Sequence, residues 1–405
     1  MLKNRNVWIV LIGEFGAGLG LWFGIIGNLE FMQRHVPSDF FKSFILFCGL
    51  LAGVFVGPLA GRMIDEYSKK KVLMYSGFGR VLSVIFMFLA INYQSIVLMI
   101  VFLVFLQISA AFYFPALQAL IPLIVKKEQL LTLNGIHMNV ATIARILGTS
   151  IGGILVVATS LTNIYGMSMI AYAFLFVMTL FINVDETHVE KTDNKKEKEK
   201  TNFTEIFKII KNTPIVFNVI ILNIVPLLFI GGFNLMVIKI SETQHSAAIK
   251  GYLYTAEGIC FLIGAFIIKY LTKYFRPNRL MYFFTGTTAI AHLSLFFSNY
   301  ALMSVFSFAL FGLSVGCFFP VASTVYQTSI DKSYHGRLFS FRSMFERVAM
   351  QIVLLSTGFF LDTIGLKYMV LIFGGISIII VLDSIRREKH NLGNSYNNET
   401  QSFSN

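Results

Sequence analysis

Long apolar stretches, separated by short polar connections, occupy most of the chain. Twelve of them hold about 20 residues or more, enough for an α-helix to cross a hydrocarbon core roughly 30 Å thick. Their approximate bounds are 7–31, 41–64, 72–92, 95–121, 132–158, 162–184, 214–238, 247–271, 280–298, 301–328, 337–361 and 366–384. The pattern therefore predicts an all-α membrane protein with twelve transmembrane helices.

The composition excludes a soluble globular protein. Of the 405 residues, 56% are hydrophobic and 13% are charged, and the mean hydropathy is +0.71. Charged residues make up about 25% of an average soluble domain. The net charge of +12 does not indicate nucleic-acid binding, because the bases are spread over short loops rather than gathered on one face. Cys48, Cys260 and Cys317 all lie in apolar stretches, so the sequence predicts neither a disulfide framework nor a metal site.

The distribution of Lys and Arg predicts the orientation in the membrane. With the N-terminus inside, the cytoplasmic segments carry about two dozen of these bases and the outer loops only about five. The outer bases are then Arg34, Lys42, Lys239, Lys250 and Lys367. The first apolar stretch is too long for a cleaved signal peptide, and an even number of spans returns the chain to the same side. We therefore expect a multi-pass protein of the cell membrane with both termini in the cytoplasm.

Polar segments divide the chain into four parts. We expect an N-terminal six-helix bundle at 1–184, a cytoplasmic linker at 185–213, a C-terminal six-helix bundle at 214–385 and a disordered cytoplasmic tail at 386–405. Within the linker, residues 203–210 alternate apolar and polar positions with a helical period, which predicts a short helix along the membrane surface.

The two predicted bundles also share short sequence features. Gly264 and the bases that follow it fall on Gly57 and its bases at one constant offset. Phe319-Pro320 falls on Phe114-Pro115 at nearly the same offset. Two matches in register favour a pseudo-symmetric duplicated architecture, which is common among transporters.

One connection combines small residues, an acid and a cluster of bases where a helix leaves the bilayer. Its members are Gly57, Gly61, Arg62, Asp65, Lys69, Lys70 and Lys71. The glycines allow close approach of another helix, and the bases mark the cytoplasmic side. A simple positively charged anchor is an alternative interpretation. The spacing resembles the loop between helices 2 and 3 of the major facilitator superfamily of secondary transporters, with Glu66 and Ser68 where that family usually has Arg and Gly. The resemblance implies two six-helix bundles and an inner gate formed by these residues.

Two further segments are similar to exporters of this superfamily. Gly148, Gly152 and Gly153 resemble the glycine-proline-x-x-glycine-glycine element of exporters, with Thr149 in place of the proline. Ordinary glycine-mediated packing is the alternative explanation. The run that begins at Phe114-Pro115 resembles the branch that holds bacterial macrolide-efflux proteins and enterobactin exporters. This similarity implies a protein of the bacterial cell membrane that exports small organic compounds with proton coupling.

Ionisable residues inside the spans are further candidates, because a charge at the centre of a bilayer costs at least about 2.5 kcal/mol. They are Glu14, Arg80, His137, Arg145, Glu257, His292, Arg342, Glu346 and Arg347. We select Glu14, Arg145 and Glu257 as candidates for coupling or substrate binding. In the fold that the chain resembles, the helices of Arg145 and Glu257 face each other, so we expect this pair to meet and to break during transport. A permanent ion pair, or no contact at all, are the alternatives. His292 is expected to be structural, and Arg342 and Glu346, one helical turn apart, are expected to neutralise each other.

No enzyme motif is present. The sequence lacks a G-x-x-x-x-G-K-[ST] nucleotide loop, and no Ser, His and Asp are arranged as a triad motif. We therefore expect no catalytic residue and no cofactor. We expect a monomeric secondary transporter that carries a small molecule across the lipid bilayer by alternating access, and the resemblance implies that protons are the coupling ion. The alternatives are a nutrient importer or facilitator of the same fold, and a transport-inactive sensor or scaffold.

Overall fold

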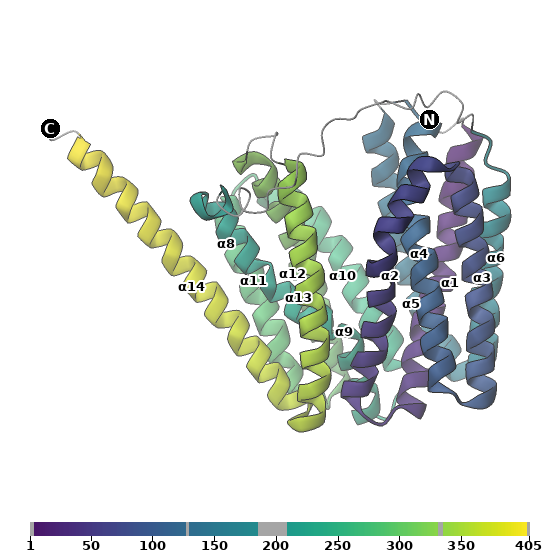
Figure 1. The fold of residues 1–405 in the computed structure, drawn as a ribbon. Helices are drawn as coiled ribbons and strands as arrows, with labels where there is room; N and C mark the ends of the chain where they lie inside the picture. The colour runs from purple at the N-terminus through teal and green to yellow at the C-terminus, as the bar shows by residue number, and fades with distance from the viewer. Residues whose placement is uncertain (1–3, 127–128, 185–208, 331–334, 403–405) are drawn as a thin grey trace. The chain divides into compact units, whose positions relative to one another are not determined.

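A computed structural model of the protein describes residues 4–126, 129–184, 209–330 and 335–402. Within these residues the major elements are all helices, and twelve segments are long and apolar enough to span a membrane. The α-helices, labelled in Figure 1, are α1 (Arg5–His35), α2 (Asp39–Glu66), α3 (Lys69–Tyr93), α4 (Ile96–Ile124), α5 (Leu130–Ala158), α6 (Leu161–Leu180), α8 (Pro214–Leu222), α9 (Ile224–Thr243), α10 (Ile249–Leu271), α11 (Pro277–Ser294), α12 (Ala301–Ser329), α13 (His335–Thr363) and α14 (Gly365–Ser402). The prediction of an all-α protein with twelve spans is confirmed.

The structure describes only part of the predicted linker and of the predicted C-terminal tail. Residues 185–208, which contain most of the predicted linker and of the predicted surface helix, lie outside the described residues. Helix α14 continues to Ser402, whereas the sequence predicted a disordered tail from residue 386. No proline interrupts this segment, and adding residues to an existing helix is far easier than starting a new one.

The seventh span is broken into two helices. α8 ends at Leu222, Asn223 forms its C-cap, and α9 begins at Ile224. Pro226 explains the break, because its ring lacks an N–H group and collides with the carbonyl of the residue four positions earlier. The interruption leaves the side chain of Asn223 inside the span, where it is 2% exposed.

The described residues form two compact units. The first contains residues 1–192 together with 241–255, and the second contains 193–240 together with 256–405. In the first unit α1 packs against α5 and α6, α2 against α4, and α3 against α4 and α6. The first unit therefore includes the end of α9, the turn after it and the start of α10, in addition to the first six spans.

The second unit repeats much of this pattern. α11 packs against α12 and α14, as α3 does against α4 and α6, and α8 packs against α14, as α1 does against α6. Its core is apolar, with buried side chains that include Val216 of α8, Phe284 of α11 and Phe318 of α12. The repeated pairings support the pseudo-symmetric duplication that the sequence features predicted.

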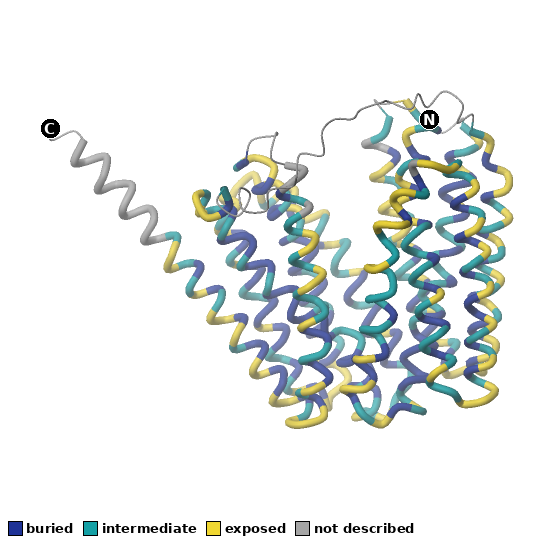
Figure 2. Tube along the Cα trace, in the orientation of Figure 1, coloured by how far each residue is buried: buried dark blue, intermediate teal, exposed yellow. Residues whose placement is uncertain are grey.

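Large apolar side chains also lie on the outside of the units. Figure 2 shows buried and exposed positions alternating along single helices. Phe55, Ile170, Phe266 and Leu302 are among the largely exposed apolar residues. Such surface is expected where a helix faces lipid chains, which are as apolar as leucine.

Glycines bring α10 and α12 into backbone contact within the second unit. A Cβ atom at Gly312 would collide with the backbone of Glu257, and one at Gly316 would collide with the backbone of Phe261. A Cβ at Gly264 would in turn meet the carbonyl oxygen of Leu313. Small residues at these positions therefore set the distance between the two helices.

We predict that Gly316→Ala lowers the midpoint of thermal unfolding in detergent, because the added methyl group forces α12 away from α10, at a cost of about 1–3 kcal/mol. Gly286→Ala is the matched control, since a Cβ there would meet no atom of the described residues within 4 Å. Alanine favours a helix over glycine by about 1 kcal/mol, so this control should be neutral or stabilising. Equal midpoints for the two variants would contradict the close packing of α10 and α12.

Candidate functional site

A buried acid in the first unit is surrounded by polar side chains from other helices. The hydroxyl of Tyr113 in α4 donates a hydrogen bond of 2.6 Å to Oε1 of Glu14 in α1. Nε2 of His137 in α5 lies 3.3 Å from the other carboxylate oxygen, Oε2. The side chains of Glu14 and His137 are only 10% and 13% exposed. Three spans thus converge on one carboxyl group.

A buried cation, Arg80, lies against the ring of Tyr113. The guanidinium carbon of Arg80 in α3 lies 4.2 Å from the centroid of the Tyr113 ring and 5.2 Å from that of Phe114. Within the described residues, Nε of Arg80 is buried without a hydrogen-bond partner. The ring faces attract the cation. Tyr113 therefore contacts Arg80 through its ring and Glu14 through its hydroxyl. We call Glu14, Tyr113, His137 and Arg80 the Glu14 cluster.

The Glu14 cluster brings together a carboxyl, a phenol and an imidazole, three groups that can each bind or release a proton. A carboxylate that accepts hydrogen bonds from a phenol and an imidazole can be held in place in either protonation state. Acids inside transmembrane segments frequently belong to proton relays or substrate pathways. Glu14, a candidate selected from the sequence, thus has polar partners in α4 and α5.

The second unit holds a related cluster at the break in the seventh span. Nδ2 of Asn223 donates a hydrogen bond of 2.6 Å to Oε1 of Glu346 in α13, and Nε of Arg342 lies 2.5 Å from the same oxygen. The Arg342 guanidinium also lies 4.9 Å from the centroid of the Tyr326 ring in α12. The predicted neutralisation of Arg342 by Glu346 is confirmed, and Asn223 and Tyr326 are additional partners that the sequence did not single out.

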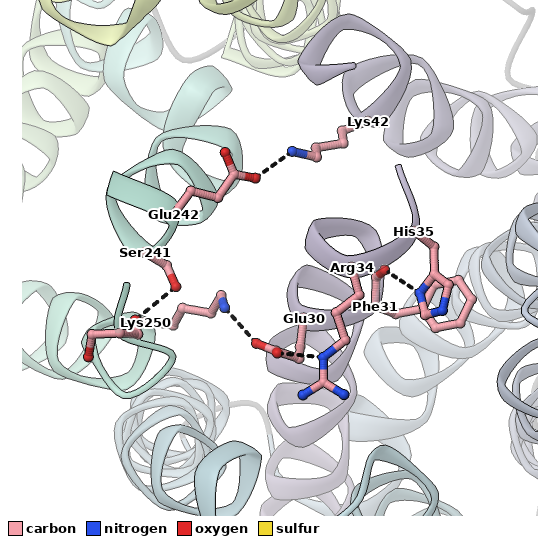
Figure 3. A network of polar contacts seen from close by, with 9 residues as sticks. Glu30, Phe31, Arg34, His35, Lys42, Ser241, Glu242 and Lys250 are labelled. Atoms are coloured by element: carbon pink, nitrogen blue, oxygen red, sulfur yellow. Dashed lines mark hydrogen bonds and ion pairs between the residues drawn. The ribbon is translucent and has the colours of Figure 1, made fainter. Parts of the chain in front are cut away.

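Near the C-terminal end of α1, charged side chains form a partly buried network in the first unit (Figure 3). Oε2 of Glu30 accepts a hydrogen bond of 2.6 Å from Nζ of Lys250 in α10. Oε1 of Glu30 accepts one of 2.8 Å from Nε of Arg34, one turn further along α1. The Lys250 side chain is fully buried, whereas that of Arg34 is 56% exposed. Glu30 therefore has one base in the interior and one at the surface.

A second ion-paired lysine lies nearby. Nζ of Lys42 in α2 lies 2.8 Å from Oδ1 of Asp39 and 2.7 Å from Oε1 of Glu242 at the end of α9. Lys42 and Asp39 are each 1% exposed. The turn that follows Glu242 is closed by Ser241, whose hydroxyl donates to the carbonyl oxygen of Ser246 at 2.8 Å.

Together these contacts hold residues 241–255 within the first unit. The six charged groups of the network balance, with three acids and three bases: Glu30, Asp39, Glu242, Arg34, Lys42 and Lys250. The sequence assigns Lys42 and Lys250 to outer loops, and the structure corrects this. Both side chains are buried, and an ion pair with an acid far away in the sequence compensates each of them for the loss of water.

The exporter-like glycines lie in the packing faces of α5. A Cβ at Gly148 would meet Cβ of Trp22 in α1 at 2.7 Å, and one at Gly152 would meet Cγ1 of Ile26 at 3.2 Å. A Cβ at Gly153 would lie 2.5 Å from Cα of Gly251. Gly148 and Gly152 therefore allow α5 to pack closely against α1. Gly153 allows α5 to touch the start of α10, so all three glycines have a packing role.

The predicted inner-gate residues lie at the connection between α2 and α3. Ser68 caps α3 by accepting a hydrogen bond from the backbone N–H of Lys71. A Cβ at Gly57 or Gly61 would meet no atom of the described residues within 4 Å. Arg62 is exposed, Lys69 and Lys70 lie in the first turn of α3, and the side chain of Asp65 lies outside what the structure describes. The gating role stays a prediction.

A largely apolar cavity of about 490 Å³ opens beside this connection, within the first unit. It is lined by Met63 and Tyr67 of the α2 end, Lys71 and Tyr75 of α3, and Phe112 of α4. A mostly apolar lining that includes one cation, Lys71, suits an amphiphilic molecule.

Arg145 and Glu257 belong to different units, and their pairing stays a prediction. Arg145 is half-buried, with its guanidinium carbon 6.0 Å from the centroid of the Trp22 ring. Glu257 is 5% exposed and lies where α10 contacts α12.

His292 has the surroundings of a structural residue. It is fully buried, and its ring centroid lies 4.8 Å from that of Phe229. Within the described residues neither ring nitrogen has a hydrogen-bond partner.

Sequence reasoning missed Tyr113 and the charged network. Tyr113 is neutral, so a survey of charges inside spans passes over it, although its position beside Phe114-Pro115 was a usable signal. In the network, the i,i+4 spacing of Glu30 and Arg34 and the i,i+3 spacing of Asp39 and Lys42 were visible. The described residues contain no group of three or more His, Cys, Asp or Glu placed to hold a metal ion.

Comparisons with known proteins identify the family. The family model of the Major Facilitator Superfamily matches residues 10–238 and 223–401. Macrolide efflux protein A of Streptococcus pyogenes is 24% identical over 374 residues, which cover 87% of this chain and 88% of that protein. The MFS-type transporter YfiS of Bacillus subtilis (strain 168) is 22% identical over 404 residues, covering 96% and 94%.

Solved structures show the same fold. The nucleoside transporter NupG superposes with a TM-score of 0.73 at 15% identity, covering 95% of this chain and 99% of that one. A D-xylose-proton symporter superposes with a TM-score of 0.72 at 11% identity, covering 93% and 96%. The chain is thus a multi-pass membrane transporter. It belongs to the major facilitator superfamily.

We predict that Lys250→Met strongly destabilises the protein, because it leaves the Glu30 carboxylate without its interior partner, a loss of about 3–5 kcal/mol. Arg34→Met removes the exposed partner of the same acid and should cost at most about 1 kcal/mol. The double variant Glu30→Gln/Lys250→Met should recover part of the loss. Thermal unfolding midpoints in detergent measure all three, and a larger loss for Arg34→Met than for Lys250→Met would refute this ranking.

Proposed function

We propose that the protein is a proton-coupled exporter of small organic compounds that works by alternating access, with both termini in the cytoplasm. The observation that carries the proposal is the Glu14 carboxyl group, buried inside a span and bonded to Tyr113 and His137. A transporter driven by a pH gradient needs such a group, which can take up a proton on one side and release it on the other. The similarity to macrolide efflux protein A supports the direction of export and makes macrolides the first compounds to assay.

In the proposed cycle, the Glu30–Lys250 and Lys42–Glu242 pairs are made in one state and broken in another. They hold residues 241–255 to the first unit, while α9 and α10 continue into the second. Interactions that differ between states set the population of each state. The pairs would therefore act as a gate at the end of α1 opposite the Glu14 cluster.

Import is the second candidate. The D-xylose-proton symporter and the nucleoside transporter NupG share the fold, and a buried acid serves symport as well as antiport. The two functions differ in the direction in which a proton gradient drives the substrate. Vesicles of known orientation therefore separate them.

We predict that Glu14→Gln abolishes the accumulation of a macrolide driven by a pH gradient in proteoliposomes, because glutamine cannot exchange a proton. Exchange of labelled for unlabelled substrate without a gradient should persist, since it needs no net proton movement. Glu257→Gln in the same assay decides between the two candidate acids. Unchanged gradient-driven accumulation by Glu14→Gln would exclude Glu14 as the coupling acid.

We also propose that Asp65 stabilises the inner gate in one state of the cycle. We expect Asp65→Asn to lower the transport rate about tenfold, because losing a contact made in only one state shifts the conformational balance. Glu66→Gln is the matched control, since this neighbouring acid is exposed and has no proposed role. Expression and unfolding temperature should be unchanged in both. Equal rates for the two variants would remove Asp65 from the mechanism.

A further inference from the structure

A basic cavity lies at the end of the second unit where α8 begins. Its volume is about 330 Å³. Three bases line it: Lys211, just before α8, and Arg386 and Arg387 of α14. One acid, Asp383, also lines it. The base distribution of the sequence predicts that this end faces the cytoplasm.

The charges at this cavity do not balance. Nη2 of Arg387 lies 2.6 Å from Oδ2 of Asp383, and both side chains are about half exposed. This pair neutralises the acid. Lys211 and Arg386 are exposed and make no ion pair with the described residues, which leaves two positive charges at the cavity. An anionic ligand would find donors here that no carboxylate of the described residues pairs with.

The start of α8 adds to the positive potential. Pro214 occupies the first helical position and lines the cavity, and Thr213 makes no side-chain capping bond. The N-terminal end of a helix carries a partial positive charge that favours anions. Independent elements, α8 and α14, therefore contribute positive potential to the same space.

The remaining lining residues are either apolar or held by hydrogen bonds. The Arg387 guanidinium carbon lies 5.6 Å from the centroid of the Phe217 ring, and Phe217 and Pro214 form the apolar side. Another lining residue is Asn218, whose Nδ2 lies 3.4 Å from the carbonyl oxygen of Ser384 and 3.4 Å from the Tyr282 hydroxyl. The cavity also lies at the ends of two membrane-spanning segments, Pro214–Thr243 and Gly365–Glu388. A ligand there would have a charged part among the bases and an apolar part towards the bilayer.

We propose that this cavity binds the phosphate of an anionic phospholipid headgroup. Guanidinium groups match phosphate geometry through paired N–H donors, and basic pockets between transmembrane helices on the cytoplasmic side bind anionic headgroups. The lipid would hold α8 and α14 together at the membrane surface. The site is separate from the Glu14 cluster and does not depend on the direction of transport.

Native mass spectrometry of the full-length protein in detergent tests the proposal, with phosphatidylglycerol and phosphatidylcholine of identical acyl chains as probes. We expect wild type to retain phosphatidylglycerol about tenfold more strongly. Lys211→Gln/Arg386→Gln/Arg387→Gln should lose this preference. The control Lys269→Gln/Lys273→Gln/Arg276→Gln removes the same charge from the same unit outside the cavity and should keep it. A preference that survives in the first variant, or is lost equally in the control, overturns the proposal.

Two further variants and one competitor sharpen the test. Lys211→Gln changes one exposed side chain, so it should fold normally and weaken phosphatidylglycerol retention severalfold. Asp383→Asn removes the competing acid and should strengthen retention, an effect of opposite sign that a purely structural role does not predict. Inorganic phosphate at millimolar concentration should not displace the lipid. Displacement would assign the site to a soluble phosphate, and weaker retention by Asp383→Asn would contradict the electrostatic argument.

Discussion

A lipid bilayer offers no water to backbone N–H and C=O groups, so each crossing must satisfy its own hydrogen bonds, and helices do so. The same medium penalises every unpaired charge. Both demands are visible in this protein. Its twelve spans are helical, and several of the charges kept inside them have partners, as Glu30 has Lys250 and Glu346 has Arg342. Where the helix breaks at Asn223, the buried amide of that residue donates to Glu346.

This constraint explains why much of the fold could be predicted from the sequence. Helix length and hydropathy follow from bilayer thickness, so the twelve spans were recovered, with ends that differ by a few residues. The break before Pro226 was not predicted, because the surrounding residues remain apolar on both sides of Asn223. The helical extension to Ser402 was also missed, since polar composition favours disorder but does not prevent an existing helix from continuing.

The candidate site was predicted only in part, for a related reason. Glu14 was found because a lone acid in a span is conspicuous, but Tyr113 carries no charge and lies 99 positions away. Lys42 and Lys250 were interpreted as solvated loop bases because the acids that pair with them lie 200 and 220 positions away in the sequence. Partners at such separations become visible only when the helices are packed. The sequence therefore indicates which groups need a partner, and the structure identifies the partner.

The central claim is that a proton enters as a small organic compound leaves. Inside-out membrane vesicles that contain the protein test it directly, with the interior acidified by respiration and monitored by a pH-sensitive dye. Adding a macrolide should partly collapse the pH gradient, and labelled macrolide should accumulate inside at the same time. Vesicles with the Glu14→Gln protein should show neither effect. Macrolide accumulation by the wild-type protein without any proton efflux, or acidification on macrolide entry, would contradict proton-coupled export.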